Sequence, residues 1–196
     1  MKKWEILGKG SAKGVEEIIQ TLLKNRGLTA ANQIKEFLNP PKPSTPRGEP
    51  SGRALMPKPL GINSQELTKA AETIKKAISL GEKIIVYGDF DADGICGTAI
   101  LWETIHHLGG KVLPYIPHRI EEGYGLSQKG IDNLLSSKPS LIITVDHGIT
   151  AAKAIEYAKK HRIEVIITDH HLPPKNLPQA LAFVQTTQLS GAGVAW

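Results

Sequence analysis

From residue 83 onward, short apolar runs alternate with longer amphipathic segments. The short runs are rich in Val and Ile and have the length of buried strands, which we expect at residues 83–88, 111–116, 141–145, 164–168 and 181–185. The segments between them space their apolar residues as helices do, which predicts helices at residues 94–109, 126–137 and 150–161. This alternation predicts an α/β fold in which helices cover both faces of a parallel sheet.

The front of the chain has a different pattern. Apolar residues at helical spacing predict a helix at residues 15–25, and a second short helix should follow and end at a proline-rich segment. That segment, residues 40–59, holds seven of the 13 prolines and predicts a linker, after which a helix should run over residues 64–78. We therefore expect a small helical and proline-rich arm at residues 1–60 and the α/β domain at residues 61–196.

Charge is distributed unevenly between these two parts. Residues 1–60 contain 11 Lys or Arg against 5 Asp or Glu, whereas residues 61–196 contain 13 against 14. A basic arm would attract the phosphate backbone of a nucleic acid. An ordinary solvated surface explains the same excess, so both interpretations stay open.

Composition narrows the class of protein. The single cysteine, Cys96, excludes an internal disulfide framework and fits a reducing compartment. No apolar stretch approaches the roughly 20 residues that a membrane-spanning helix needs. The first ten residues, MKKWEILGKG, lack the apolar core of a signal peptide. We expect a cytoplasmic protein that does not contact a membrane.

Acidic and histidine residues follow three of the predicted strands. They are Asp89, Asp91 and Asp93 in VYGDFDADG, Asp146 in IITVDHG, and Asp169, His170 and His171 in VIITDHH. The carboxyl ends of parallel strands share one edge of an open sheet, which is where such sheets bind ligands. A single Asp at a strand end is often a helix N-cap, but three clusters at one edge favour a metal site.

Crowded carboxylates repel one another and require protons or cations to neutralise them. Oxygen ligands with an added imidazole suit Mn²⁺, or Mg²⁺ with a weaker preference, better than they suit structural zinc. Two such ions roughly 3.5–4 Å apart can activate water and stabilise the leaving oxygen in phosphoester hydrolysis. We therefore expect a site for two ions.

The ordered motifs GDFDADG, VDHGI and TDHH resemble those of the DHH phosphoesterase superfamily, and IPHRIEEGYG and SGAGVAW resemble its RecJ branch of single-strand DNA exonucleases. The resemblance covers residues 83–196 and implies a Rossmann-like DHH domain. In that family a further metal-ligating Asp and a second substrate-binding domain follow the last motif. We therefore expect the domain to be truncated at Trp196 and the isolated chain to be inactive or nearly so.

The resemblance also implies roles for individual residues. Asp91 and Asp93 would bind the two metals, with Asp89 as a further ligand or a neighbour of one. Many relatives have a His where this chain has Tyr87, which favours a direct role for Asp89. Asp146 would bridge the ions, since it can offer one oxygen to each. The expected catalytic and metal-binding set is Asp89, Asp91, Asp93, Asp146, His170 and His171.

Within the TDHH motif, the resemblance makes His170 a ligand and His171 either a ligand or a contact to the scissile phosphate. Asp169 would orient an imidazole through its second nitrogen. His147 is interpreted as structural or as a neighbour of the ligands. We interpret the remaining histidines of the helices, His106, His107 and His161, as structural.

Two further segments are candidates for binding nucleic acid. Arg119 could bind a phosphate and Tyr124 could stack on a base, unless Arg119 pairs with Glu121 or Glu122 instead. In SGAGVAW, the amides of Gly191 and Gly193 could approach a phosphate at a helix start, although close helix packing explains the glycines equally well.

The leading hypothesis is a metal-dependent phosphodiesterase that degrades single-stranded DNA from the 5′ end in repair or recombination. A DHH hydrolase of short oligonucleotides, cyclic dinucleotides or pyrophosphate is the alternative within this fold. A catalytically silent nucleic-acid-binding scaffold is the alternative of another class. We expect a monomer whose partners are single-stranded DNA and a single-strand-binding protein or helicase.

Overall fold

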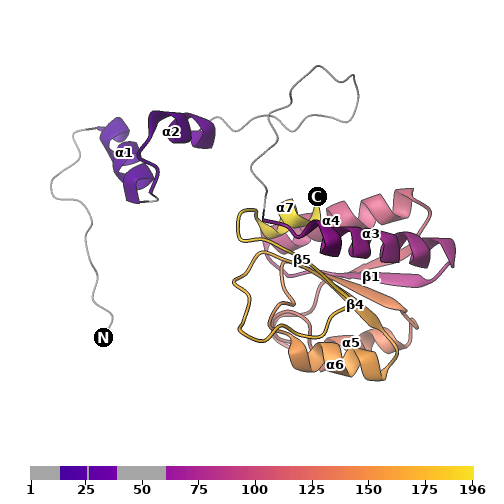
Figure 1. Cartoon of the computed structure of the whole chain (residues 1–196). Coiled ribbons are helices and arrows are strands. Elements are labelled where there is room, and N and C mark those ends of the chain that lie inside the picture. Colours follow the sequence, from indigo (N-terminus) through magenta and orange to yellow (C-terminus); the bar gives the residue numbers. More distant parts are fainter. Residues whose placement is uncertain (1–13, 26, 39–60) are drawn as a thin grey trace, which may run out of the picture. The chain divides into compact units, whose positions relative to one another are not determined.

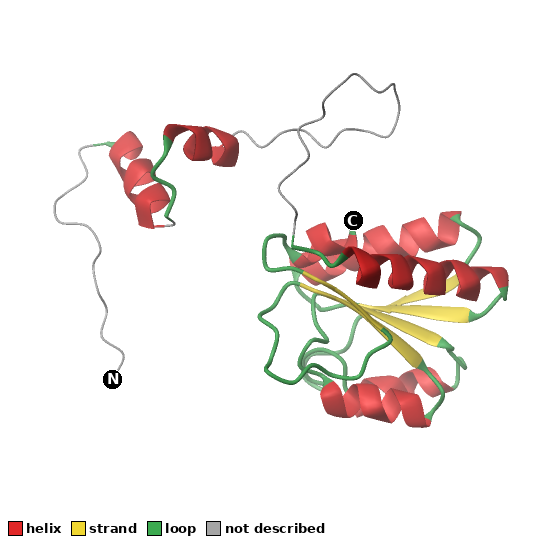
Figure 2. Cartoon of the chain, in the orientation of Figure 1, coloured by secondary structure: helices red, strands yellow, loops and turns green. Residues whose placement is uncertain are grey.

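Helices and strands alternate through most of the chain in the computed structural model, which describes residues 14–25, 27–38 and 61–196 (Figures 1 and 2). The chain forms two compact units, residues 1–54 and 55–196. The predicted proline-rich linker at residues 40–59 lies outside the described residues.

The first unit contains two short helices, α1 (Val15–Asn25) and α2 (Ala31–Leu38). Gly27 joins them with a positive φ of 76°, a conformation that glycine adopts without steric cost. Leu23 of α1 is buried, whereas Phe37 and Leu38 of α2 are exposed. Both helices lie where their apolar spacing predicts them.

The second unit is built on a five-stranded sheet with the order β2-β1-β3-β4-β5, and all four strand pairs are parallel. Its strands are β1 (Lys83–Tyr87), β2 (Lys111–Tyr115), β3 (Leu141–Val145), β4 (Glu164–Asp169) and β5 (Ala182–Gln185). Its helices are α3 (Ser64–Ser79), α4 (Ala92–His107), α5 (Gln128–Leu135), α6 (Ala152–Lys160) and α7 (Gly191–Ala195). The predicted α/β class is therefore confirmed.

The two faces of the sheet carry separate apolar layers, because successive side chains of a strand point to opposite faces. In β1, Ile84 and Val86 belong to the layer that packs against α3, α4 and α7. Ile85 and Tyr87 belong to the layer that packs against α5 and α6. Figure 2 shows the helices on both faces of the sheet. Since both faces are covered, the strands read as continuous apolar runs.

Side-chain caps fix where several helices begin. Asn63 accepts a hydrogen bond from the Gln65 amide at 2.9 Å and caps α3, and Ser127 accepts one from the Gly130 amide at 3.0 Å and caps α5. Asp91 caps α4, which therefore begins two residues before the predicted start at Gly94. Among the described residues, no helix is both long and apolar enough to cross a membrane.

Candidate metal centre

The loop after β1 places two carboxylates at the edge of the sheet. Asp89 is buried, and one of its oxygens accepts a hydrogen bond from the Phe90 amide at 2.8 Å. Asp91 accepts hydrogen bonds from the amides of Asp93 and Gly94 at 3.0 and 2.9 Å through a single oxygen, Oδ1. Burial raises the pKa of Asp89, against the opposing effect of the Phe90 hydrogen bond. The Oδ2 atom of Asp91 thus remains available to a cation.

Gly88 makes this turn possible. A Cβ atom at this position would lie 1.9 Å from Thr98 Oγ1 and 3.1 Å from the Gly94 carbonyl oxygen. Only glycine lets the chain pass so close to the start of α4. Gly88, the first residue of the GDFDADG motif, therefore sets the direction in which the chain carries Asp89 and Asp91 away from the strand.

Asp146 follows β3 in a strained turn. Its φ is 67°, which is uncommon for a residue with a side chain, and Gly148 continues the turn with a φ of 114°. The Thr144 hydroxyl donates to the His147 carbonyl at 2.8 Å and closes the turn. This arrangement points a buried carboxylate into the site.

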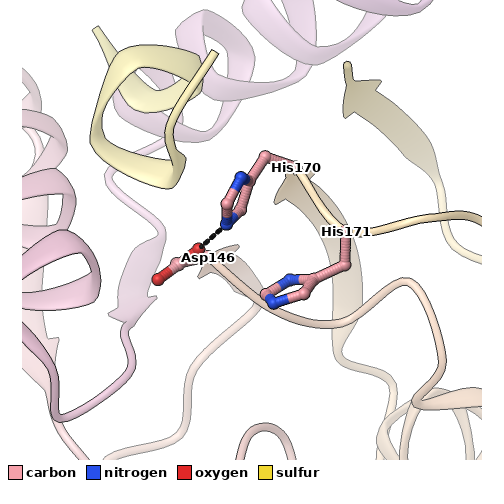
Figure 3. Close-up of side chains that lie close together, drawn as sticks. All are labelled: Asp146, His170 and His171. Atoms are coloured by element: carbon pink, nitrogen blue, oxygen red, sulfur yellow. Dashed lines mark ion pairs between the residues drawn. The ribbon is translucent and has the colours of Figure 1, made fainter. Parts of the chain in front are cut away.

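The Asp146 carboxylate is poorly compensated. Its Oδ1 atom is buried and has no hydrogen-bond donor of good geometry among the described residues, although His170 Nε2 lies 3.0 Å away (Figure 3). Burial and the negative charge of Asp93 raise the pKa of Asp146 to about 6. A buried anion with so little hydrogen bonding is costly, and a bound cation would lower that cost.

The TDHH motif lies at the end of β4. Asp169 Oδ2 accepts a hydrogen bond from the Ile149 amide at 2.9 Å, and Asp169 Oδ1 lies 2.7 Å from His171 Nδ1. Partial burial lowers the pKa of His171, but the hydrogen bond to Asp169 and its charge outweigh burial, so the net pKa is raised. With Nδ1 held by Asp169, Nε2 of His171 is the nitrogen left for a metal or a phosphate.

These residues form two groups that share Asp146. Ligand atoms of Asp146, His170 and His171 lie within 4.8 Å of one another, and so do ligand atoms of Asp89, Asp91 and Asp146. Figure 3 shows the imidazoles of His170 and His171 lying beside Asp146. Carboxylate oxygens with imidazole nitrogens and no thiolate fit Mn²⁺ or Mg²⁺, and a cation would neutralise the buried Asp146 carboxylate. The arrangement can hold two neighbouring ions with Asp146 between them.

The structure does not bring Asp93 into either group. Its two oxygens accept hydrogen bonds from the amides of Gly191 and Ala192, each at 2.7 Å. The Gly193 amide donates to Ser190 Oγ at 3.1 Å. The amides of Gly191 and Gly193 that the sequence offered to a phosphate therefore have partners within the chain.

Arg119 and Tyr124 lie on the segment after β2. The Arg119 guanidinium lies 4.2 Å from the centre of the Phe90 ring, a cation–π contact. The suggested pairing with Glu122 is not seen, because the Glu122 carboxylate instead accepts from the Tyr115 hydroxyl and, at 2.9 Å, from the His118 amide. Tyr124 is 57% exposed, and its hydroxyl lies 3.5 Å from the Asp146 carbonyl oxygen. Both side chains border the acidic groups.

The sequence pattern did not indicate Phe90, and it led us to expect His147 to be structural or a neighbour of the ligands. Phe90, between two carboxylates, carries no chemistry of its own, and only the structure shows that it supports Arg119. His147 is buried edge-on against Tyr87, and burial lowers its pKa to about 4. Tyr87 itself packs into the layer of α5 and α6, with its hydroxyl 3.3 Å from the Gly125 carbonyl oxygen. The apolar neighbours of His147 come from distant segments, so sequence spacing could not identify its environment.

The chain is similar in sequence to known exonucleases. The chain is 42% identical over 191 residues to the single-stranded-DNA-specific exonuclease RecJ of Bacillus subtilis, covering 93% of this chain and 23% of that protein. It is 42% identical over 136 residues to RecJ of Thermus thermophilus, covering 66% of this chain and 20% of that protein. The chain thus spans about a quarter or less of the length of these relatives.

Two solved structures share the fold. A crystal structure of exonuclease RecJ bound to manganese matches with a TM-score of 0.62 and 38% identity, covering 74% of this chain and 37% of that one. RecJ of Thermus thermophilus in complex with Mn²⁺ matches with a TM-score of 0.61 and 32% identity, covering 90% of this chain and 24% of that one. Residues 83–196, more than half of the chain, match the model of the DHH family, N-terminal domain, and the chain therefore belongs to the DHH family.

Proposed function

We propose that this chain is the DHH domain of a metal-dependent exonuclease that degrades single-stranded DNA from the 5′ end. Asp146 carries the proposal, because its buried carboxylate belongs to both groups of candidate ligands and its Oδ1 atom has no hydrogen-bond donor of good geometry among the described residues. Relatives at 42% identity are named single-stranded-DNA-specific exonucleases, and a structural relative binds manganese.

Each residue of the site has a definite task in this proposal. Asp89, Asp91, Asp146 and His170 hold two ions, either Mn²⁺ or Mg²⁺. When bound, the ions supply charge neutralisation and an activated water for attack on the phosphodiester. His171, oriented by Asp169, contacts the scissile phosphate through Nε2.

In this proposal the segment after β2 binds the single-stranded DNA. Arg119, held over Phe90, binds a backbone phosphate, and the exposed ring of Tyr124 stacks on a base. The basic excess of residues 1–60 adds electrostatic attraction for the strand. We propose that the protein works as a monomer in the cytoplasm, with a single-strand-binding protein or helicase supplying its substrate.

The proposal is tested by following the cleavage of labelled DNA by the complete gene product in Mn²⁺. Single strands labelled at the 5′ end should release labelled mononucleotides at once, whereas strands labelled at the 3′ end should shorten progressively. Blunt duplex of the same sequence is the matched control and should persist. Activity that survives a chelator, or equal cleavage of single strand and duplex, would reject the proposal. Hydrolysis confined to dinucleotides or pyrophosphate would favour the small-substrate alternative.

A further inference from the structure

Asp93 fastens α7 to the start of α4. Its Oδ2 atom accepts a hydrogen bond from the Gly191 amide and its Oδ1 atom accepts one from the Ala192 amide, both at 2.7 Å. Such short bonds from amides to a carboxylate are charge-assisted and stronger than neutral ones. They join residues 98 and 99 positions apart in the sequence. Each Asp93 oxygen therefore uses one of its lone pairs to hold the first turn of α7.

The first turn of α7 is in direct contact with a candidate metal ligand. A Cβ atom built on Gly191 would lie 2.3 Å from Asp146 Oδ1 and 2.4 Å from Asp146 Cγ. The Asp146 carboxylate is therefore in contact with the Gly191 backbone, and a larger residue at 191 would have to displace it. The same oxygen, Asp146 Oδ1, lies 3.0 Å from His170 Nε2.

Gly97 of α4 lets the small helix come this close. A Cβ atom on Gly97 would lie 2.6 Å from Val145 Cγ1 and 3.2 Å from Ala192 Cα. Val145 directly precedes Asp146 at the end of β3. Glycines on two helices and a carboxylate on one of them thus hold the backbone around Asp146 in place.

We propose that Asp93 and Gly191 are positioning residues of the metal centre, which fix the direction of the Asp146 carboxylate by holding α7 against it. The inference rests on the proposed function, because it assigns Asp146 to the metals. It differs from the role that the sequence alone suggested for Asp93, which was that of a ligand. Neighbours that orient a ligand typically change metal affinity or activity about 10- to 100-fold when they are substituted.

The test compares Mn²⁺ binding by the complete gene product and its variants, measured by calorimetry and by electron paramagnetic resonance. Gly191→Ala should weaken binding about 10- to 100-fold. Gly193→Ala is the matched control, since its Cβ would meet only side-chain atoms of Leu189 and Ser190 at 3.3 Å or more. The inference would be overturned if folded Gly191→Ala bound Mn²⁺ as tightly as folded Gly193→Ala.

Asp93→Asn separates positioning from ligation and changes the side-chain shape least. An amide oxygen can still accept from one of the two backbone amides, so this variant should keep two bound ions and lose less affinity than Asp93→Ala. At saturating Mn²⁺ it should lower kcat on single-stranded DNA with little change in KM. Loss of one equivalent of Mn²⁺ in Asp93→Asn would overturn the inference and make Asp93 a ligand. If the unsubstituted protein binds no Mn²⁺, the proposed function itself fails, a result distinct from either of these.

Discussion

Asp93 and Asp146 are two carboxylates at the same edge of the sheet, and they have opposite surroundings. Asp93 has a hydrogen bond on each oxygen, and although burial raises its pKa, the bonds from Ala192 and Gly191 outweigh burial, so the net pKa is lowered. Asp146 is buried with an oxygen that lacks a donor, and its pKa is raised to about 6. The two carboxylates at this edge therefore differ in the hydrogen bonds that surround them.

The largest effect expected from this comparison is on catalysis. Asp146→Ala in the complete gene product should lower turnover on single-stranded DNA by orders of magnitude, because both groups of ligands lose a shared member. Binding of the strand should change far less, since Arg119 and Tyr124 are untouched. Rates are measured at saturating DNA and Mn²⁺, with Glu156→Ala as the control, which removes an exposed carboxylate paired with Lys160 at 3.7 Å. Equal turnover in Asp146→Ala and Glu156→Ala would remove Asp146 from the mechanism.

Substitution of the two residues should have opposite effects on the stability of the metal-free protein. The pKa of Asp146 is raised, so its contribution to stability is present at low pH and is lost as pH rises through about 6. The pKa of Asp93 is lowered, so its contribution is present at neutral pH and is lost as pH falls through the folded-state pKa. At pH 7.5, Asp146→Asn should therefore be more stable than the unsubstituted protein and Asp93→Asn less stable, each by about 1–3 kcal/mol.

Urea unfolding in the presence of a chelator measures both differences, and repeating it at acid pH provides the control. The advantage of Asp146→Asn should vanish near pH 4, where the native carboxyl is already protonated. An Asp146→Asn variant that is less stable than the unsubstituted protein at pH 7.5 would show that the buried carboxylate is compensated without metal.

The sequence predicted the fold well because its signals are local. The apolar runs that became β1, β3 and β4 are short and continuous, and their positions differ from prediction by at most one residue. The same strand-end rule predicted that Asp89, Asp91, Asp146 and the two histidines lie close together, as they do in the structure. Parallel strands make this possible, because their carboxyl ends must meet at one edge.

What the sequence could not show depends on contacts between distant segments. Asp91 and Asp93 lie in one motif, and only the approach of α7 shows that both oxygens of Asp93 accept backbone hydrogen bonds. In the sequence, Gly191 resembles a phosphate-binding glycine, whereas the structure shows that it contacts Asp146. Phe90 supports Arg119 from a segment that precedes it by a helix and a strand. Motif spacing contains no information about these pairings.

Protonation of Asp146 should also control metal affinity. Because its pKa is raised to about 6, a proton competes with the metal for this carboxylate below that pH. Mn²⁺ affinity should change little above pH 7 and fall by about tenfold for each pH unit below the pKa of this single group. Calorimetric titrations from pH 5 to pH 8 measure this dependence. Mn²⁺ affinity that is constant between pH 5 and pH 7 would contradict the raised pKa of Asp146.

The smallest effect concerns the residue that sits between Asp89 and Asp91. Phe90→Leu removes the aromatic face beneath Arg119 but keeps an apolar side chain, and a cation–π contact is worth about 0.5–1 kcal/mol when exposed and about 2 when desolvated. Single-stranded DNA binding should weaken severalfold, with turnover at saturating DNA nearly unchanged. Tyr157→Phe on α6, which loses only a hydroxyl bonded to Asp132 at 2.6 Å, is the control.

A double-mutant cycle decides whether Phe90 acts through Arg119 or by itself. If the ring holds the guanidinium in position for a phosphate, Phe90→Leu should cost little once Arg119→Ala is present, because the group it supports is gone. Affinities of the two single variants and the double variant for single-stranded DNA give the coupling energy, which should be at least about 0.5 kcal/mol. Strictly additive losses would instead indicate that Phe90 contacts the DNA directly, as a second stacking surface beside Tyr124.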